Sequence, residues 1–317
     1  MGNTASTRVA VTEALLELAE KDPGIVLICS DSLLVVKAQP FIEKYPDRFI
    51  DVGIAEQNAV GCAAGLASCG LKPFYVTYAG FITMRACEQV RTFVAYPGLN
   101  VKMIGANGGM GAGEREGVTH QFFEDLGILR TFPGMTIVVP ADASNVKQAV
   151  KAVANMEGPA YIRIGSGRDP VLPDPGEPFK LGEARILRNR GNDLALFANG
   201  FILPRVLAAA DRLDRLGIKT TVVEVHTLKP LDRNTLLKVL KKTKAAVTVE
   251  DHNIIGALGS AMAELIAEEF PVPLVRVGLQ DVFPRSGESE ALLDHYHLGV
   301  ADIVQAAQTV LRKKGKI

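Results

Sequence analysis

The chain has 317 residues, of which 48 % are hydrophobic and 22 % charged, a composition typical of globular proteins with buried cores. Lysine plus arginine and aspartate plus glutamate both number 35, so the charge balance does not indicate a nucleic-acid partner or an acidic membrane surface. No uninterrupted apolar run reaches the ~18 residues that a membrane-spanning helix needs, so no membrane association is expected.

In the first half of the chain, apolar segments typical of buried strands alternate with segments of helical periodicity. The predicted strands are 24–32, 48–54, 72–78, 100–107, 135–142 and 159–165. The predicted helices are 8–21, 59–70, 85–96 and 145–156. Apolar strands separated by amphipathic helices predict a parallel sheet that is covered on both faces.

A proline-rich segment, PVLPDPGEPF (170–179), interrupts this alternation, because its four prolines in ten residues suit neither helix nor sheet. The alternation then restarts. It comprises predicted strands 193–200, 219–226, 245–251 and 273–279 and predicted helices 203–217, 233–242 and 256–270. We therefore expect an α/β protein with two parallel-sheet domains, residues 1–175 and 183–317.

A single carboxylate, Glu56, stands between the predicted strand 48–54 and the predicted helix 59–70. The simpler interpretation is an acid favoured by the helix dipole, which contributes about 0.3–1 kcal/mol. The helix behind it, however, carries a stripe of small residues, Gly61, Ala64, Gly65 and Ser68, that permits close packing. We therefore expect Glu56 to lie in a tight interface, where burial favours an acid that shares its proton.

The segment 104–121, IGANGGMGAGEREGVTHQ, is rich in glycine and allows a close approach of the backbone to a ligand. It has neither the Gly-Lys-Ser/Thr of a P-loop nor the spacing Gly-x-Gly-x-x-Gly. It leads to His120, which is either a catalytic group or an ordinary polar residue.

Tyr78 and Phe81 stand three residues apart and are either core or pocket residues. Glycines at 256–259 begin a helix that could face an anion or pack closely.

The four cysteines have neither metal-ligand spacing nor a Cys-x-x-Cys pair. We interpret all four as reduced core residues of a cytoplasmic protein: Cys29, Cys62, Cys69 and Cys87.

Taken together, these segments resemble the transketolase family of thiamine diphosphate enzymes over nearly the whole chain. The motifs that carry the resemblance are FIDVGIAEQNAVGCAAGLA (49–67), TYAGFITMRACEQVR (77–91), GEREGVTHQ (113–121), VVPADA (138–143) and HTLKPLD (226–232). The chain is most similar to the carboxyl-terminal subunit of a split transketolase, in which a pyrimidine-binding domain precedes a transketolase C-terminal domain.

The resemblance implies a role for each candidate residue around the cofactor. Glu56 would bond the pyrimidine ring nitrogen of thiamine diphosphate and so promote loss of the thiazolium proton. Phe81 would stack on the pyrimidine, Tyr78 would line the same pocket, and Asp31 would lie near the cofactor at the subunit contact.

The resemblance also implies a substrate site. His120 would contact the reacting end of the donor sugar, together with Glu116 from the same loop. Arg8 and Arg168 would bind the substrate phosphate, a task suited to a guanidinium.

One segment of the family pattern is absent from this sequence. Transketolases bind the diphosphate through magnesium, or calcium, with a Gly-Asp-Gly segment and a later Asn on the amino-terminal domain, and this chain has no Gly-Asp-Gly. The resemblance therefore implies that this chain holds no metal ligand of its own. A separate amino-terminal subunit would supply the diphosphate half in an assembly of two copies of each chain.

Departures from the family pattern concentrate on the substrate side. Arg115 is inserted before Glu116, Asn107 stands where a phosphate-side histidine is common, and Val35 replaces a phosphate-contacting serine. Pro284 and Arg285 interrupt a later loop. Sugars other than the usual pentose and hexose phosphates are therefore possible substrates.

Three alternatives stay open from the sequence. The chain could be the beta subunit of a 2-oxo acid dehydrogenase decarboxylase component, which shares the glutamate and the domain pair. The second alternative is a deoxyxylulose phosphate synthase, but such a chain normally carries its own diphosphate half. The third is a non-catalytic α/β scaffold, which would have no need of Glu56. Transfer of a two-carbon ketol unit between sugar phosphates is the function that we expect.

Overall fold

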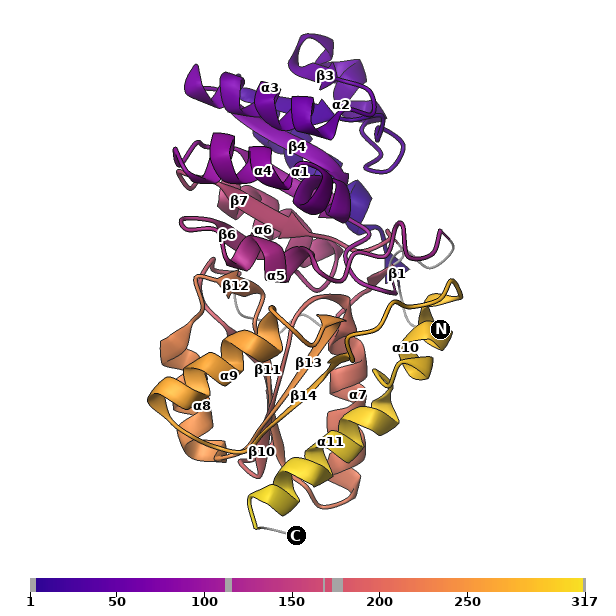
Figure 1. Cartoon of the computed structure of the whole chain (residues 1–317), viewed down its shortest axis with the longest axis vertical. Coiled ribbons are helices and arrows are strands. Elements are labelled where there is room, and N and C mark those ends of the chain that lie inside the picture. Colours follow the sequence, from indigo (N-terminus) through magenta and orange to yellow (C-terminus); the bar gives the residue numbers. More distant parts are fainter. Residues whose placement is uncertain (1–3, 112–115, 168, 173–178, 316–317) are drawn as a thin grey trace.

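The structure is a computed structural model that describes residues 4–111, 116–167, 169–172 and 179–315. The first half of the chain forms the upper α/β unit in Figure 1 and the second half forms the lower one. Both units contain a predominantly parallel sheet flanked by helices, which confirms the predicted fold class. Within the described residues, no helix has the length and apolarity needed to cross a bilayer.

The first sheet has seven strands in the order β12-β6-β7-β5-β4-β2-β3. Its strands are β2 (Ile25–Cys29), β3 (Phe49–Asp51), β4 (Lys72–Tyr78), β5 (Lys102–Ala106), β6 (Thr136–Val138), β7 (Ala160–Arg163) and β12 (Thr227–Lys229). All neighbours pair in parallel except β12, which comes from the second half of the chain and pairs antiparallel with β6. The sheet is therefore parallel, as predicted, with one antiparallel strand added at this edge.

Both faces of this sheet are buried. In β2, Val26 and Ile28 belong to one apolar cluster, whereas Ile25, Leu27 and Cys29 belong to another. Successive side chains of a strand point to opposite faces, so this division places one cluster on each side of the sheet. The continuous apolar run of the sequence is explained by this double burial.

Helices from the first half cover these two faces. α1 (Thr7–Ala19) and α6 (Ala143–Ala154) contribute to one apolar cluster, and α3 (Glu56–Ser68) contributes to the other. The shorter helices of this unit are α2 (Gln39–Lys44), α4 (Cys87–Gln89) and α5 (Asp125–Arg130). The predicted helix 85–96 differs from the structure, because two π-helical segments, Phe81–Arg85 and Val90–Ala95, flank α4.

The second sheet has the order β14-β13-β10-β11-β9, with β9 as its antiparallel edge. Its strands are β9 (Arg185–Asn189), β10 (Leu194–Ala198), β11 (Thr220–Glu224), β13 (Ala246–Asn253) and β14 (Leu274–Leu279). Its helices are α7 (Leu203–Arg215), α8 (Arg233–Thr243), α9 (Leu258–Glu269), α10 (Ser289–His295) and α11 (Val300–Lys313).

Two features join the units. One apolar cluster contains Ile137 of the first unit together with Phe197 and Met262 of the second. In addition, β12 of the second half pairs with β6 of the first half. The short strands β1 (Thr4–Ala5) and β8 (Asp169–Pro170), both of the first half, pair with each other near the junction of the units. The domain limits 1–175 and 183–317 stay a prediction, since residues 173–178 lie outside the described part of the chain.

The cysteines are only partly as expected. All four are free, but Cys29 alone is buried, Cys62 and Cys87 are half-buried, and Cys69 is exposed. The expectation that all four are core residues is therefore wrong for Cys69.

Candidate functional site

The candidate residues follow the carboxyl ends of adjacent parallel strands. Asp31 comes two residues after β2, Glu56 follows β3, Tyr78 ends β4, and Asn107 comes directly after β5. Ligands of open α/β sheets bind at this edge, because parallel strands bring their carboxyl ends together. The topology thus brings residues as far apart in the sequence as Asp31 and Asn107, 76 positions, to the same edge of the sheet.

Glu56 is the first residue of α3, and its side chain is only 2 % exposed. Its Oε1 accepts a hydrogen bond of 2.6 Å from Nη1 of Arg85, whose own side chain is 47 % exposed. The prediction of a buried acid at the head of this helix is confirmed. Arg85 was missed, although it lies four residues after Phe81, a spacing that places two side chains on one helical face.

An aromatic cluster lies beside this ion pair. The ring centroids of Tyr78 and Phe81 are 5.4 Å apart, and that of His120 lies 5.1 Å from Tyr78 and 5.5 Å from Phe81. The guanidinium carbon of Arg85 lies 4.1 Å from the centroid of the Phe81 ring. The structure therefore brings together three of the predicted residues and links them to Glu56 through Arg85.

Phe122 is a further member of this cluster that the sequence did not indicate. Its ring centroid lies 5.5 Å from that of Phe81. A Cβ on Gly80 would lie 2.0 Å from the Phe122 ring, so only glycine permits this approach. Phe122 is buried, whereas Tyr78, Phe81 and His120 are half-buried, so Phe122 is the innermost ring of the cluster.

His120 is half-buried at the end of the glycine-rich segment. Its Nδ1 lies 3.0 Å from the hydroxyl oxygen of Thr119, and its backbone N–H donates to the carbonyl of Gly117 over 2.9 Å. These contacts orient the imidazole while its ring packs against Tyr78 and Phe81.

Arg8 lies near the same edge, in the first turn of α1. Its Nη2 donates to Oδ1 of Asn107, and its buried Nε has no hydrogen-bond partner among the described residues. Burial lowers the pKa of Arg8, while Tyr78, Asp169 and the exposed Glu116 act in the opposite direction. A desolvated guanidinium with a free N–H group is suited to binding an anion.

The other predicted residues do not belong to the aromatic cluster. Asp31 has an exposed side chain, a left-handed φ of 51°, and a backbone N–H that donates to Asp51 over 2.9 Å. It therefore lies on a neighbouring strand end and is not part of the aromatic cluster. Arg168 and Arg115 lie outside the described residues. Val35 is half-buried and packs against the apolar cluster on the α1 face.

The small-residue stripe on α3 is divided between two environments. Ala64 is buried in the core, whereas Gly65 and Ser68 are exposed and Gly61 is half-buried. A Cβ on Gly61 or Gly65 would meet no atom within 4 Å. Packing within this chain therefore does not explain the two glycines.

The glycine-containing start of α9 does not face a foreign anion. The carboxylate of Glu250 accepts hydrogen bonds of 2.7 Å from the backbone N–H groups of Leu258 and Gly259. Burial raises the pKa of Glu250 to about 7. The start of α9 thus faces the carboxylate of this chain's own Glu250, and it also packs closely, since a Cβ on Gly256 would lie 2.9 Å from Cα of Gly127.

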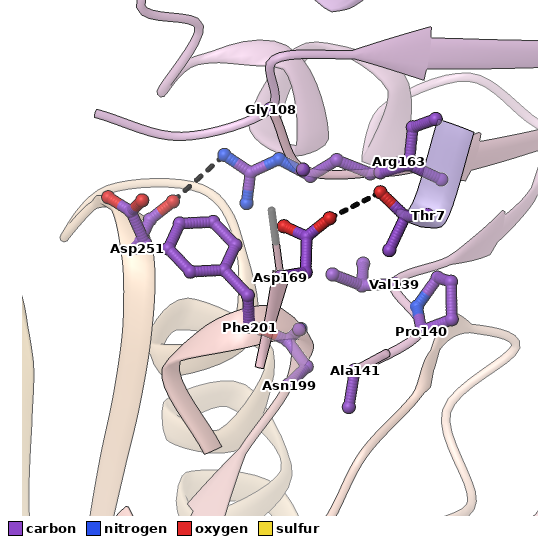
Figure 2. A pocket seen from close by; sticks show the side chains of 13 residues that line it. Thr7, Gly108, Val139, Pro140, Ala141, Arg163, Asp169, Asn199, Phe201 and Asp251 are labelled. Carbon is purple, nitrogen blue, oxygen red and sulfur yellow. Dashed lines mark hydrogen bonds between the residues drawn. The ribbon is translucent and has the colours of Figure 1, made fainter. Parts of the chain in front are cut away.

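Between the two units lies a small pocket that the sequence did not indicate (Figure 2). Arg163 and Asp251 lie at one side of it and Asn199 at another, with Asp169 between them. The Thr7 hydroxyl donates to Asp169 over 2.5 Å. Among the residues that the structure describes, neither polar atom of the Asn199 side chain has a hydrogen-bond partner.

Two parts of the chain match known family models. Residues 3–167 match the transketolase pyrimidine binding domain, and residues 182–303 match the transketolase C-terminal domain. A 6-deoxy-6-sulfo-D-fructose transketolase subunit from Clostridium sp. (strain MSTE9) is 40 % identical over 97 % of this chain and 95 % of its own length. One of the subunits of an apulose-4-phosphate transketolase from Phocaeicola vulgatus is 36 % identical over 98 % of this chain and 99 % of its own.

The solved structures agree with these matches. A split gene transketolase, described as an inactive beta4 tetramer, superimposes with a TM-score of 0.89 at 40 % identity and covers 98 % of this chain and 99 % of its own. A transketolase from Pichia stipitis is 20 % identical, has a TM-score of 0.83 and shares the fold. This chain therefore belongs to the transketolase family, and the relatives of similar length named above are two transketolase subunits and a split gene transketolase.

Proposed function

We propose that this chain is the carboxyl-terminal subunit of a two-chain transketolase, which uses thiamine diphosphate to transfer a two-carbon ketol unit from a ketose to an aldose. The observation that carries the proposal is the environment of Arg85. Its flat guanidinium donates to Glu56 and lies over the ring of Phe81. A pyrimidine ring would make the same two contacts, so Glu56 and Phe81 fit this part of the cofactor at the place that the Arg85 guanidinium occupies here.

The cofactor supplies the acidic carbon on which the ketol unit is carried. In this proposal, Glu56 holds a proton at the pyrimidine ring nitrogen, and its burial strengthens that hydrogen bond. Phe81 and Tyr78 exclude water and fix the plane of the ring, and Asp31 approaches the cofactor from the neighbouring strand end. His120 donates a hydrogen bond to an oxygen at the reacting end of the sugar.

The opposite end of the sugar is anionic in this proposal. Arg8 binds that anion with the N–H groups left free by Asn107, together with Arg168, and Glu116 contacts the sugar hydroxyls. The two relatives named above act on a sulfonated sugar and on a sugar phosphate. A guanidinium binds either group, so a ketose phosphate is our first candidate and a sulfonated ketose our second.

The active site is completed by a second chain in this proposal. This sequence has no Gly-Asp-Gly, so an amino-terminal subunit with Gly-Asp-Gly and a later Asn binds the diphosphate through magnesium or calcium. Two copies of each chain form the cytoplasmic assembly. The open space beside Gly61 and Gly65 supports close packing of the partner on α3.

The proposal is tested by affinity capture of this chain from its native lysate, followed by ketol-transfer assays on the purified complex. We expect a stoichiometric partner with Gly-Asp-Gly and a complex that transfers the ketol unit only when both chains and thiamine diphosphate are present. Recovery of the chain alone would indicate a scaffold. Recovery with a lipoyl-bearing acyltransferase would indicate a 2-oxo acid dehydrogenase.

A further inference from the structure

Asp251 is a buried carboxylate of the second unit that binds the backbone of the first. It lies near the end of β13 and is 3 % exposed. Its Oδ1 accepts a hydrogen bond of 3.0 Å from the N–H of Met110, and its Oδ2 accepts one of 3.1 Å from the N–H of Gly111. The carboxylate thus uses both oxygens on the start of the segment that leads to His120.

The adjacent glycine shows how close this contact is. Gly109 has a φ of +103°, and a Cβ at this position would lie 2.2 Å from Oδ2 of Asp251. Its N–H donates to the carbonyl of Phe122 over 2.7 Å. The backbone around Gly109 therefore lies between Asp251 on one side and Phe122 of the aromatic cluster on the other.

Arg163 forms a second link between Asp251 and the cluster (Figure 2). Its Nη2 donates to the backbone carbonyl of Asp251 over 2.8 Å and to that of Phe122 over 2.9 Å. Its Nε lies 3.2 Å from Asp125 in a buried ion pair. A displacement of Asp251 is thereby transmitted to Phe122, whose ring contacts Phe81 and lies 6.3 Å from that of His120.

The second unit also holds the far end of the same segment. The side-chain amide of Gln121, directly after His120, donates to the carbonyl of Arg285 over 3.0 Å. The second unit thus binds the backbone at Met110 and Gly111 and also the side chain of Gln121, and the first of these contacts is made by an acidic side chain. Hydrogen bonds to an ionised group are stronger than neutral ones, so Asp251 is the more effective anchor.

We propose that Asp251 is a positioning residue for ketol transfer: from the second domain, it fixes the backbone at Met110 and Gly111 and, through Gly109 and Arg163, the position of Phe122 beside His120. The inference rests on the proposed function. It assigns no contact between Asp251 and the substrate. Its role is to hold the geometry in which His120 meets the reacting end of the sugar.

The chain offers a matched control, Glu250. It is equally buried, and its two oxygens also accept two backbone N–H groups, but both of these belong to α9 of its own unit. Asp251→Asn leaves one acceptor and turns an amide N–H₂ toward a backbone N–H. Glu250→Gln makes the same chemical change at hydrogen bonds that lie within the second unit, and like Asp251→Asn it removes a carboxylate that interacts with the charge of Arg163, so it also controls for that electrostatic effect. A general loss of packing affects both variants, whereas a positioning role affects only the first.

The experiment compares wild type, Asp251→Asn and Glu250→Gln in the complex with the captured partner. For Asp251→Asn we expect kcat to fall at least tenfold and KM for the ketose to rise, with unchanged affinity for thiamine diphosphate. Hydrogen exchange should become faster at Met110 and Gly111 only in this variant. In Glu250→Gln, faster exchange should be confined to the start of α9, and kcat and KM should stay within twofold of wild type.

Equal kinetic constants for the two variants in an active complex would overturn the inference and leave the proposed function intact. An inactive wild-type complex would overturn the proposed function itself, and the inference with it. If Asp251→Asn does not fold, Gly109→Ala disturbs the same contact from the other side, and it should reproduce the loss of kcat. Wild-type kinetics in Gly109→Ala would contradict the inference as well.

Discussion

At the scale of single residues, the structure gives Glu56 a partner that the sequence did not indicate. The sequence predicted the burial of this acid, because an isolated carboxylate preceded a helix of small residues. It did not predict Arg85, since a contact over 29 positions depends on how α3 packs against the segment 81–95. Asp251 was missed for the same reason, because its partners lie 140 and 141 residues away in the chain.

The ion pair between Glu56 and Arg85 has a measurable energetic consequence. Arg85→Met keeps an unbranched side chain at this position but removes the guanidinium from the Phe81 ring and leaves Glu56 buried without its charged donor. Because about half of the Arg85 side chain reaches water, we expect a loss of about 1–2 kcal/mol in the free energy of unfolding of the isolated chain. Urea denaturation monitored by circular dichroism measures this loss.

A double-mutant cycle provides the control for this prediction. In a Glu56→Gln background, Arg85→Met should destabilise the chain clearly less than in the wild-type background, because the contact with Phe81 is lost but no buried charge is left unpaired. If Arg85→Met has the same effect in both backgrounds, the ion pair does not stabilise the chain.

At the scale of elements, the sequence was most informative where the periodicity was strong. The buried strands β2, β4 and β5 and the helix α7 lie within the predicted segments, and the helices α1 and α6 begin one and two residues before the segments predicted for them. The edge strands β9 and β12 were missed. β12 has only three residues and pairs with a strand almost 90 positions earlier, so its sequence carries no local signal.

The glycines of α3 lead to a prediction about assembly. Gly65 is exposed, and a side chain there meets nothing within 4 Å. Gly65→Leu should therefore leave the isolated chain as stable as wild type, or stabilise it by up to about 1 kcal/mol through helix propensity. The same change should block association with the partner chain, which sedimentation velocity of the mixed chains would detect.

Gln305→Leu on α11 adds the same side chain to another exposed helical position and should not impair assembly. Normal assembly of Gly65→Leu would show that α3 is not at the subunit contact.

At the scale of the whole molecule, the two units are joined by a shared apolar cluster and by buried polar residues. His226 is one of these polar residues, and its ring stacks on Phe179 with centroids 4.1 Å apart. Burial, together with the charge of Arg185, lowers the pKa of His226 to about 3. The folded chain therefore binds fewer protons than the unfolded chain below the ordinary histidine pKa of about 6.5.

It follows that the contribution of His226 to stability is present above about pH 6.5 and is lost as the pH falls toward 3. His226→Phe retains the stacking but cannot bind a proton. Between pH 7.5 and pH 5, wild type should lose about 2 kcal/mol more unfolding free energy than this variant. Urea titrations at the two pH values measure the difference, and equal losses would contradict the prediction. His252 and Glu250 also titrate in the acid to neutral range, but wild type and His226→Phe both contain them, so they do not affect the comparison.

The proposed chemistry depends most on Glu56, because it requires a carboxylate at the pyrimidine ring. The decisive measurement is ketol transfer by the reconstituted complex with Glu56→Gln, and the exposed Glu88→Gln serves as the control. We expect kcat to fall by about 10²–10⁴ in Glu56→Gln, with unchanged assembly, and to stay at the wild-type value in Glu88→Gln. Wild-type activity of an assembled Glu56→Gln complex would contradict the role of this residue and the active site built around it.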